Sequence, residues 1–243
     1  MRFIRFRCAP EDCKAVIAVT IRTSSFTLSL SAPEDPASPF QLVIGLRITS
    51  SMQPGRPITI CTGNSVFERS PPPSGGLDML AQGAVGGGLI NTHNNKRIGL
   101  GLFRLHHGVY PSDSSPDLKI RGKEFITIPG DGSESRVTHD LPFSRMFKYA
   151  EGIKKEDLQP GETYKVGIYH GCVGTTWWCW GALDGDLKGK RLCAWQEGFE
   201  YNDVARPSDE EVEREGWVLG MHPAQLKFED QTEGGYAELR IVE

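Results

Sequence analysis

Short segments rich in valine, isoleucine, threonine and phenylalanine recur from one end of the chain to the other, separated by glycine, proline, asparagine and aspartate. The first group of residues favours strands and the second favours turns. Within residues 25–30, apolar Phe26, Leu28 and Leu30 alternate with polar residues, which predicts one face on a core and the other in water. The pattern as a whole predicts an all-β fold. The expected strands are residues 15–22, 25–30, 41–48, 57–61, 98–105, 124–128, 135–139, 163–169, 225–228 and 236–242.

These strands leave no boundary that would divide the 243 residues into two domains. All-β domains often exceed 200 residues, so we expect one β-sandwich domain over residues 1–243. Two irregular insertions interrupt the expected strands, at residues 70–88 and 171–216. The second insertion contains Ser208 and, three residues later, Glu211, which is the spacing of a helix-capping box. The sequence therefore predicts a sandwich with long loop insertions and one short helix.

A turn with a tyrosine at the start of the next strand occupies residues 158–164, which read LQPGETY. A tyrosine at this place can return its hydroxyl group to the backbone a few residues upstream, as in the tyrosine corner of Greek-key sandwiches. The segment resembles the corresponding corner of immunoglobulin-like domains, and this resemblance implies an immunoglobulin-like Greek-key β-sandwich. Residues 125–141 also resemble part of the accessory sandwiches of fungal metallopeptidases. The chain has no His-Glu-x-x-His motif, so the peptidase activity does not carry over.

Five further segments share a second resemblance, and they are residues 57–60, 65–67, 125–130, 174–181 (GTTWWCWG) and 216–220. Together these segments resemble an uncharacterised fungal protein family with proteins of similar size. This resemblance implies a fungal origin and a single sandwich domain, and it implies no particular activity.

Charge and hydropathy exclude several classes of partner. The formal net charge is −4, and a nucleic-acid partner would require a basic surface. The apolar run at residues 15–19 is far shorter than the ~20 residues that cross a bilayer. Charged residues interrupt the first twenty positions, so we expect no secretory signal and a cytoplasmic protein. In that compartment we expect the six cysteines to be mostly thiols rather than a disulfide framework.

A cluster of tryptophans is the feature that the fold explains least. Trp177, Trp178, Trp180 and Trp195 lie within twenty residues. On an extended segment Trp178 and Trp180 would share one face and Trp177 would lie on the other, so both faces would need cover. The rings are either a core beneath the second insertion or the wall of a pocket for a small apolar or aromatic ligand.

Polar residues near this cluster give weaker signals. His170 adjoins the tryptophan segment and is the best single candidate for an acid or base. Asp184 and Asp186 have the spacing that begins a calcium loop, but Lys188 stands where an oxygen ligand belongs, so a solvated turn is favoured. The sequence also lacks a P-loop and a serine-hydrolase elbow. We therefore expect no catalytic residue, metal or cofactor.

Two functions remain open. The favoured one is a non-catalytic binding or interaction module that presents the second insertion to a small apolar or aromatic ligand or to a protein partner. The alternative is an enzyme acting on a small apolar metabolite in a tryptophan-lined pocket, with His170 or the two aspartates as acid and base. The expected ligand contacts are Trp177, Trp178, Trp180, His170, Asp184 and Asp186.

Overall fold

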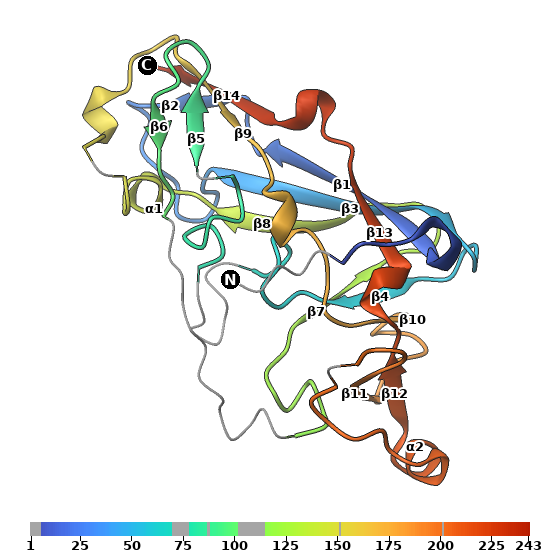
Figure 1. Ribbon diagram of the computed structural model, residues 1–243. Helices are drawn as coiled ribbons and strands as arrows, with labels where there is room; N and C mark the ends of the chain where they lie inside the picture. Colours follow the sequence, from blue (N-terminus) through green and yellow to red (C-terminus); the bar gives the residue numbers. More distant parts are fainter. Residues whose placement is uncertain (1–5, 70–77, 87, 102–114, 151, 201) are drawn as a thin grey trace.

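The computed structural model describes residues 6–69, 78–86, 88–101, 115–150, 152–200 and 202–243 (Figure 1). Strands in several sheets dominate these ranges, which confirms the expectation of a mostly β fold. The α-helices are α1 Phe143–Met146 and α2 Asp209–Glu215. The strands are β1 Ala15–Thr23, β2 Thr27–Ser29, β3 Gln41–Ser51, β4 Ile58–Cys61, β5 Leu89–Asn91, β6 Arg97–Ile98, β7 Phe125–Ile128, β8 Ser135–Asp140, β9 Thr163–Val166, β10 Trp178–Trp180, β11 Arg191–Gln196, β12 Trp217–Gly220, β13 Leu226–Asp230 and β14 Ala237–Val242.

Two larger sheets form the body of the protein. The first has the strand order β13-β1-β3-β8 and the second has the order β2-β14-β9-β5-β6. Most neighbours are antiparallel, but β1 pairs with β13 and β2 pairs with β14 in parallel. Residues 15–29 and 226–242 therefore run in the same direction, and both pass from the first sheet to the second.

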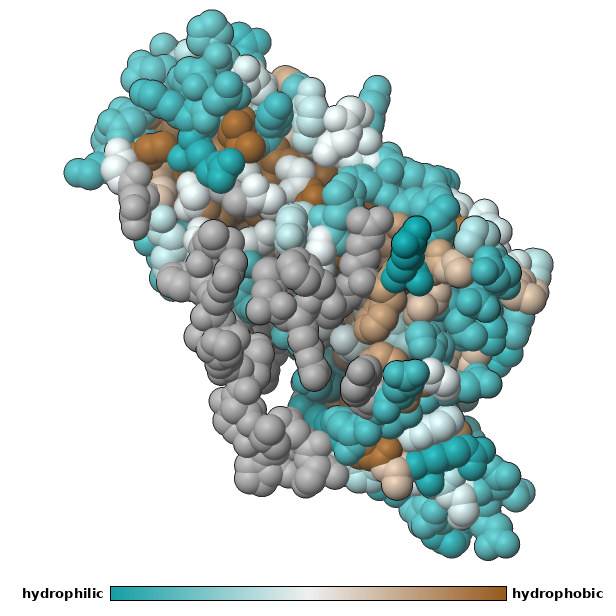
Figure 2. All heavy atoms as spheres, in the orientation of Figure 1, coloured by the Kyte–Doolittle hydropathy of each residue, from teal (hydrophilic) through white to brown (hydrophobic). Residues whose placement is uncertain are grey.

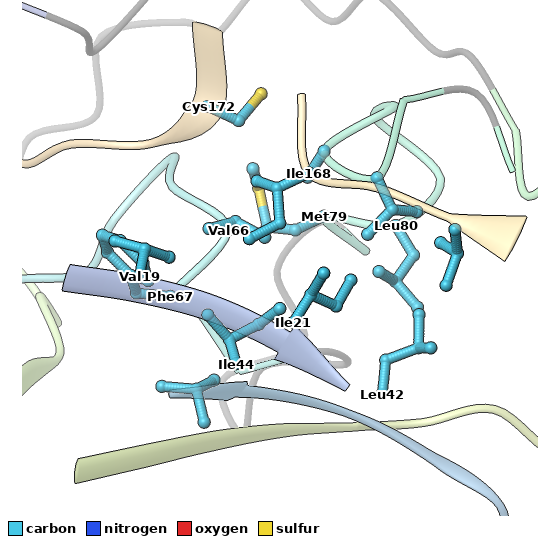
Figure 3. Packing of buried hydrophobic residues seen from close by; sticks show 14 of the residues in the cluster. Val19, Ile21, Leu42, Ile44, Val66, Phe67, Met79, Leu80, Ile168 and Cys172 are labelled. Carbon is cyan, nitrogen blue, oxygen red and sulfur yellow. The ribbon is translucent and has the colours of Figure 1, made fainter. Parts of the chain in front are cut away.

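The core between these sheets follows from alternation along the strands. In β14, Ala237, Leu239 and Ile241 are buried, and the residues between them are partly or fully exposed. Apolar side chains of β1 and β3 share one cluster with side chains of β9 and β14, as in a β-sandwich. Figure 3 shows part of this cluster, where Ile21 and Leu42 lie near Leu80 and Ile168. Burial of apolar surface on both sheets is the main force that holds them together.

Three long connections meet in a third sheet, whose strand order is β10-β4-β7. Each strand comes from a different connection: β4 follows β3, β7 precedes β8, and β10 follows β9. In this sheet Ile60 is paired with both Trp178 and Ile126. Strands β11 and β12 pair in parallel beside it, and α2 leads into β12. We call β4, β7, β10, β11, β12 and α2 the accessory layer.

Helix α2 confirms the predicted capping box. The Ser208 hydroxyl accepts a hydrogen bond from the Glu211 N–H at 3.2 Å, and the Glu211 carboxylate accepts one from the Ser208 N–H at 2.8 Å. Gly216 ends the helix in the left-handed conformation, with φ of 62°, which glycine adopts without steric cost. No residue of α2 is buried, and Figure 2 shows a mostly hydrophilic surface at this end of the molecule.

Several strand predictions need correction. Phe26 is 59% exposed and precedes β2, because the strand begins at Thr27. The expected strand at residues 98–105 is reduced to β6 at its start, and residues 102–105 lie outside the described part of the chain. Residues 70–77 and 87 of the first insertion also lie outside it. The second insertion is not irregular, since it holds β10 and β11.

The tyrosine corner has a different hydrogen bond from the one expected. Tyr164 is buried at the start of β9, after the turn at residues 158–162. Its hydroxyl group donates to the Glu162 carboxylate at 3.0 Å and not to the upstream backbone. The short span to Glu162 allows its flexible side chain to replace the backbone acceptor. Burial is the main cause that raises the pKa of Tyr164.

Candidate functional site

The three tryptophans that were predicted to contact a ligand are buried, and their side chains lie on the two faces of the segment that forms β10. Trp178 and Trp180 are 0% and 9% exposed and belong to the main core, whereas Trp177 is 1% exposed and belongs to a second cluster in the accessory layer. The Trp178 Nε1–H donates to the carbonyl of His222 at 2.9 Å, and the Trp177 Nε1–H donates to that of Cys193 at 2.8 Å. Both faces of this segment are therefore packed against other residues, as expected from the sequence. The burial favours a filled core over a pocket wall.

Asp184 and Asp186 lie on an exposed turn of the accessory layer. The Asp186 carboxylate accepts a hydrogen bond from the Ala182 N–H at 2.7 Å and lies 3.8 Å from the Arg56 guanidinium. Both contacts stabilise the turn, as the sequence interpretation favoured. The groove described next is lined by His170 and by neither aspartate. The structure thus does not bring the proposed acid and base groups together.

A groove of about 390 Å³ lies where three segments distant in the sequence meet. These segments are the N-terminal stretch at residues 6–8, the turn at residues 170–175 and the chain at residues 223–230, which includes β13. Figure 1 shows the N-terminal stretch in dark blue. This stretch passes between β13 on one side and the turn that follows β9 on the other. The groove therefore lies between the start of the insertion that carries the tryptophans and the chain that follows this insertion.

The lining of the groove combines apolar and charged groups. Val173 and Leu226 are buried in its wall, and Phe228 is partly buried and stacked on the core residue Phe67 at a centroid distance of 5.7 Å. His170 is exposed at the start of the turn. Arg7 forms no ion pair with any other residue that the structure describes. An apolar wall beside an unpaired cation suits a ligand with an apolar body and a negative charge.

The remaining charged groups of the groove are engaged with neighbours. The Lys227 ammonium is 2.6 Å from the Glu229 carboxylate, and Asp230 accepts a hydrogen bond from the Thr232 N–H at 2.9 Å. The bond to Glu229 raises the pKa of Lys227, so this side chain stays charged at neutral pH. These pairs fix the polar side of β13. Among the described residues that line the groove, Arg7 is then the cation available to a ligand.

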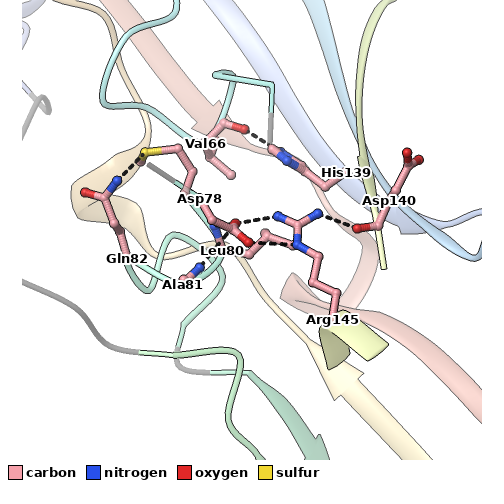
Figure 4. Close-up of polar contacts among 9 residues, drawn as sticks. Val66, Asp78, Leu80, Ala81, Gln82, His139, Asp140 and Arg145 are labelled. Carbon is pink, nitrogen blue, oxygen red and sulfur yellow. Dashed lines mark hydrogen bonds and ion pairs between the residues drawn. The ribbon is translucent and has the colours of Figure 1, made fainter. Parts of the chain in front are cut away.

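Sequence reasoning missed a partly buried polar cluster around the buried His139 (Figure 4). His139 is 0% exposed, and its Nε2–H donates to the Val66 carbonyl at 2.8 Å, while Nδ1 has no hydrogen-bond partner among the described residues. Nearby, the Arg145 Nε–H donates to the Asp78 carboxylate at 2.8 Å, and the same guanidinium group also contacts the Asp140 carbonyl. Burial is the main cause that holds the pKa of His139 below its usual value.

This cluster ties the first connection to β8 and α1, because Asp78 lies in the connection, His139 in β8 and Arg145 in α1. Alternation along β8 was the available signal: Val137 and His139 fall on the inward face, between exposed residues. The neutral imidazole has no contact with the groove, so we assign it a structural role.

Among the described residues, no group of three or more histidine, cysteine, aspartate or glutamate side chains could hold a metal ion. In the same part of the chain, no helix is long and apolar enough to cross a bilayer. All six cysteines are free thiols. No protein-family model, curated protein or solved structure matches the chain. The resemblance to a fungal family stays a prediction.

Proposed function

We propose that this protein is a binding module built on an immunoglobulin-like Greek-key sandwich. In this assignment β1, β3 and β8 are strands A, B and E of one sheet, and β14, β9, β5 and β6 are strands G, F, C and C′ of the other. The observed pairings support it, because β3 pairs with β8 and β9 pairs with both β14 and β5, all antiparallel. The buried Tyr164 stands at the start of strand F, where the fold places its corner tyrosine.

The three long connections leave the sandwich at one end in this assignment. They join B to C, C′ to E and F to G, and each contributes one strand to the β10-β4-β7 sheet. Variable immunoglobulin domains carry their binding loops at one end of the sandwich, among them the B–C and F–G loops. Here the buried tryptophans hold the corresponding connections in a fixed accessory layer, so the layer is a rigid support for a site beside it.

The groove beside β13 is the observation that carries the proposal. It opens between the two ends of the F–G connection and has room for a small aromatic ligand. Its buried Val173 and Leu226 can cover an apolar ring, and Arg7 can pair with a carboxylate. The module therefore binds a small aromatic or apolar molecule that carries a negative charge. His170 supplies a hydrogen-bonding group at the rim.

A titration with 2-naphthoate, followed by amide chemical shifts in NMR spectra, tests this proposal. A ligand of about 13 non-hydrogen atoms that gains about −0.3 kcal/mol per atom would bind with a Kd of roughly 1 mM. We expect shifts concentrated at residues 6–8, 170–175 and 223–230. The neutral analogue 2-naphthalenemethanol should bind more weakly, because it cannot pair with Arg7.

Two variants separate this site from general charge attraction. Arg7→Gln should weaken 2-naphthoate binding about three- to fivefold, as expected for loss of one partly exposed ion pair. Arg47→Gln is the matched control, because Arg47 is exposed and does not line the groove. Equal weakening in both variants, or shifts spread over the whole surface at saturation, would refute the proposed site.

A further inference from the structure

Cys8 and Cys13 lie at the two ends of a tight turn that precedes β1. The Asp12 N–H donates to the Ala9 carbonyl at 3.1 Å, and the Cys13 N–H donates to the Pro10 carbonyl at 3.4 Å. These bonds form a single turn of 3-10 helix over Pro10–Asp12, which folds the chain back on itself. The Cys8 thiol donates to the Ala9 carbonyl at 3.6 Å and the Cys13 thiol donates to the Ala15 carbonyl at 3.4 Å. As a result of the turn, the two thiol groups lie close enough to interact with each other.

These two cysteines differ from the other four in their exposure. Cys8 and Cys13 are partly exposed, whereas the others are buried in the core or in the accessory layer. Lys227 lies close enough to both sulfur atoms to interact electrostatically with each of them. A thiol pair that reaches solvent beside a cation has the surroundings in which thiol–disulfide exchange takes place. The buried thiols are Cys61, Cys172, Cys179 and Cys193.

We propose that Cys8 and Cys13 are a modification site that forms a reversible intramolecular disulfide by exchange with a low-molecular-weight disulfide such as oxidised glutathione. In the first step the Cys13 thiolate attacks one sulfur of glutathione disulfide, which breaks its S–S bond and releases one glutathione thiolate. The Cys8 sulfur, after losing its proton to solvent, then attacks Cys13 Sγ and releases the second glutathione. The protein loses two hydrogen atoms, and one glutathione disulfide is reduced to two thiols.

The surroundings of the pair set this order of attack. Burial, followed by the hydrogen bond and charge of Cys13, raises the pKa of Cys8 to about 12. Cys8 therefore keeps its proton at neutral pH, and we assign the first attack to Cys13. Once Cys13 is in a mixed disulfide, its thiol no longer contributes to the raised pKa of Cys8. Cys8 then becomes the resolving thiol.

The disulfide would join Cys8, which lines the groove, to the residue two positions before β1. It thereby constrains the N-terminal wall of the groove. The proposal does not depend on the ligand, because formation of the bond is measured on the free protein. Failure of ligand binding and failure of disulfide formation are therefore separate results.

Peptide mapping reports the bond directly, because trypsin cleaves after Arg7 and Lys14 and leaves both cysteines in one peptide, CAPEDCK. The native full chain is equilibrated with defined ratios of reduced and oxidised glutathione, quenched with acid, alkylated in denaturant and digested. We expect peptide 8–14 to appear without alkyl groups and lighter by two hydrogen atoms. The four buried cysteines serve as internal controls and should be fully alkylated.

The same equilibrium measured in urea shows whether the fold creates the site. We expect the equilibrium constant for the disulfide to be at least about tenfold larger in the folded protein than in the unfolded chain. Equal constants would overturn the proposal, as would a doubly alkylated peptide 8–14 in excess oxidised glutathione. Cys8→Ser should accumulate glutathione on Cys13, and Cys13→Ser should react more slowly at Cys8. The reverse order would overturn the assigned roles.

Discussion

Replacement of Trp178 by alanine tests whether the tryptophan cluster is core. The side chain is 0% exposed, donates to the His222 carbonyl at 2.9 Å and meets the Trp180 ring edge to face at a centroid distance of 5.3 Å. Truncation of a buried tryptophan destabilises a protein by about 3–5 kcal/mol. The lost hydrogen bond and ring pair place this site in the upper part of that range. We expect a loss of about 4–5 kcal/mol.

For a chain of this length, each kcal/mol corresponds to about 2–4 °C, so the melting temperature should fall by roughly 8–20 °C. Circular dichroism is the suitable probe, because the substitution removes a fluorophore. If Trp178→Ala fails to fold, Trp178→Phe keeps most of the ring and should show a smaller loss. Trp195→Ala is the matched control in the same insertion, since Trp195 is only partly buried. It should lower stability by less than about 1.5 kcal/mol.

If Trp178 is a core residue, its replacement by alanine must lower the melting temperature. If Trp178→Ala melts within about 2 °C of the parent protein, the packing argument is wrong. A variant that keeps its melting temperature but loses affinity for 2-naphthoate would instead support the interpretation that Trp178 is part of the wall of a ligand pocket.

Three further predictions concern other parts of the fold. Gly130→Ala should destabilise the protein by more than about 2 kcal/mol in urea titrations, because an added Cβ would lie 2.3 Å from the backbone of Gly55. Gly63→Ala is the control and should be close to neutral, because the nearest atoms to its added Cβ are at 3.9 Å. Burial lowers the pKa of His139 in the fold, so its contribution to stability is complete above about pH 6.5 and decreases as the pH falls toward the folded pKa, by at most about 1.4 kcal/mol per pH unit. In His139→Gln the urea midpoint of unfolding should therefore change less between pH 7.5 and 5.5 than in the parent protein. The same pH dependence in both proteins would contradict this prediction. Tyr164→Phe should lower the free energy of unfolding by about 0.5–1.5 kcal/mol without changing ligand affinity, because the Glu162 acceptor is partly exposed and can be hydrated; no loss of stability would show that the corner bond is unimportant.

The sequence signals that worked were local ones. Segments rich in strand-forming residues and bounded by turn residues predicted β1 and β14 closely, and the spacing of Ser208 and Glu211 predicted the start of α2. The alternation of bulky residues at positions 177–180 also predicted that both faces of β10 would be covered. Each of these features depends on residues a few positions apart.

The features that were missed depend on distant residues. Strand β5 has three residues, which is too short for a period to be visible, and its place is set by pairing with β9. Tyr164 is a local exception, because it was expected to bond to the backbone and the side chain of Glu162, two positions away, supplies the acceptor instead. The groove joins segments about 50 to 220 positions apart in sequence, so no local pattern could reveal it.

Contacts between a bound ligand and the groove test the proposed function most directly. With methyl-labelled protein and 2-naphthoate, nuclear Overhauser effects report which methyl groups lie within about 5 Å of the ring protons. We expect effects to the methyl groups of Val173 and Leu226, both of which line the groove. They should disappear when excess unlabelled protein competes for the ligand. Effects confined to other methyl groups, or none at a concentration that saturates the chemical shifts, would contradict the assignment of this groove as the binding site.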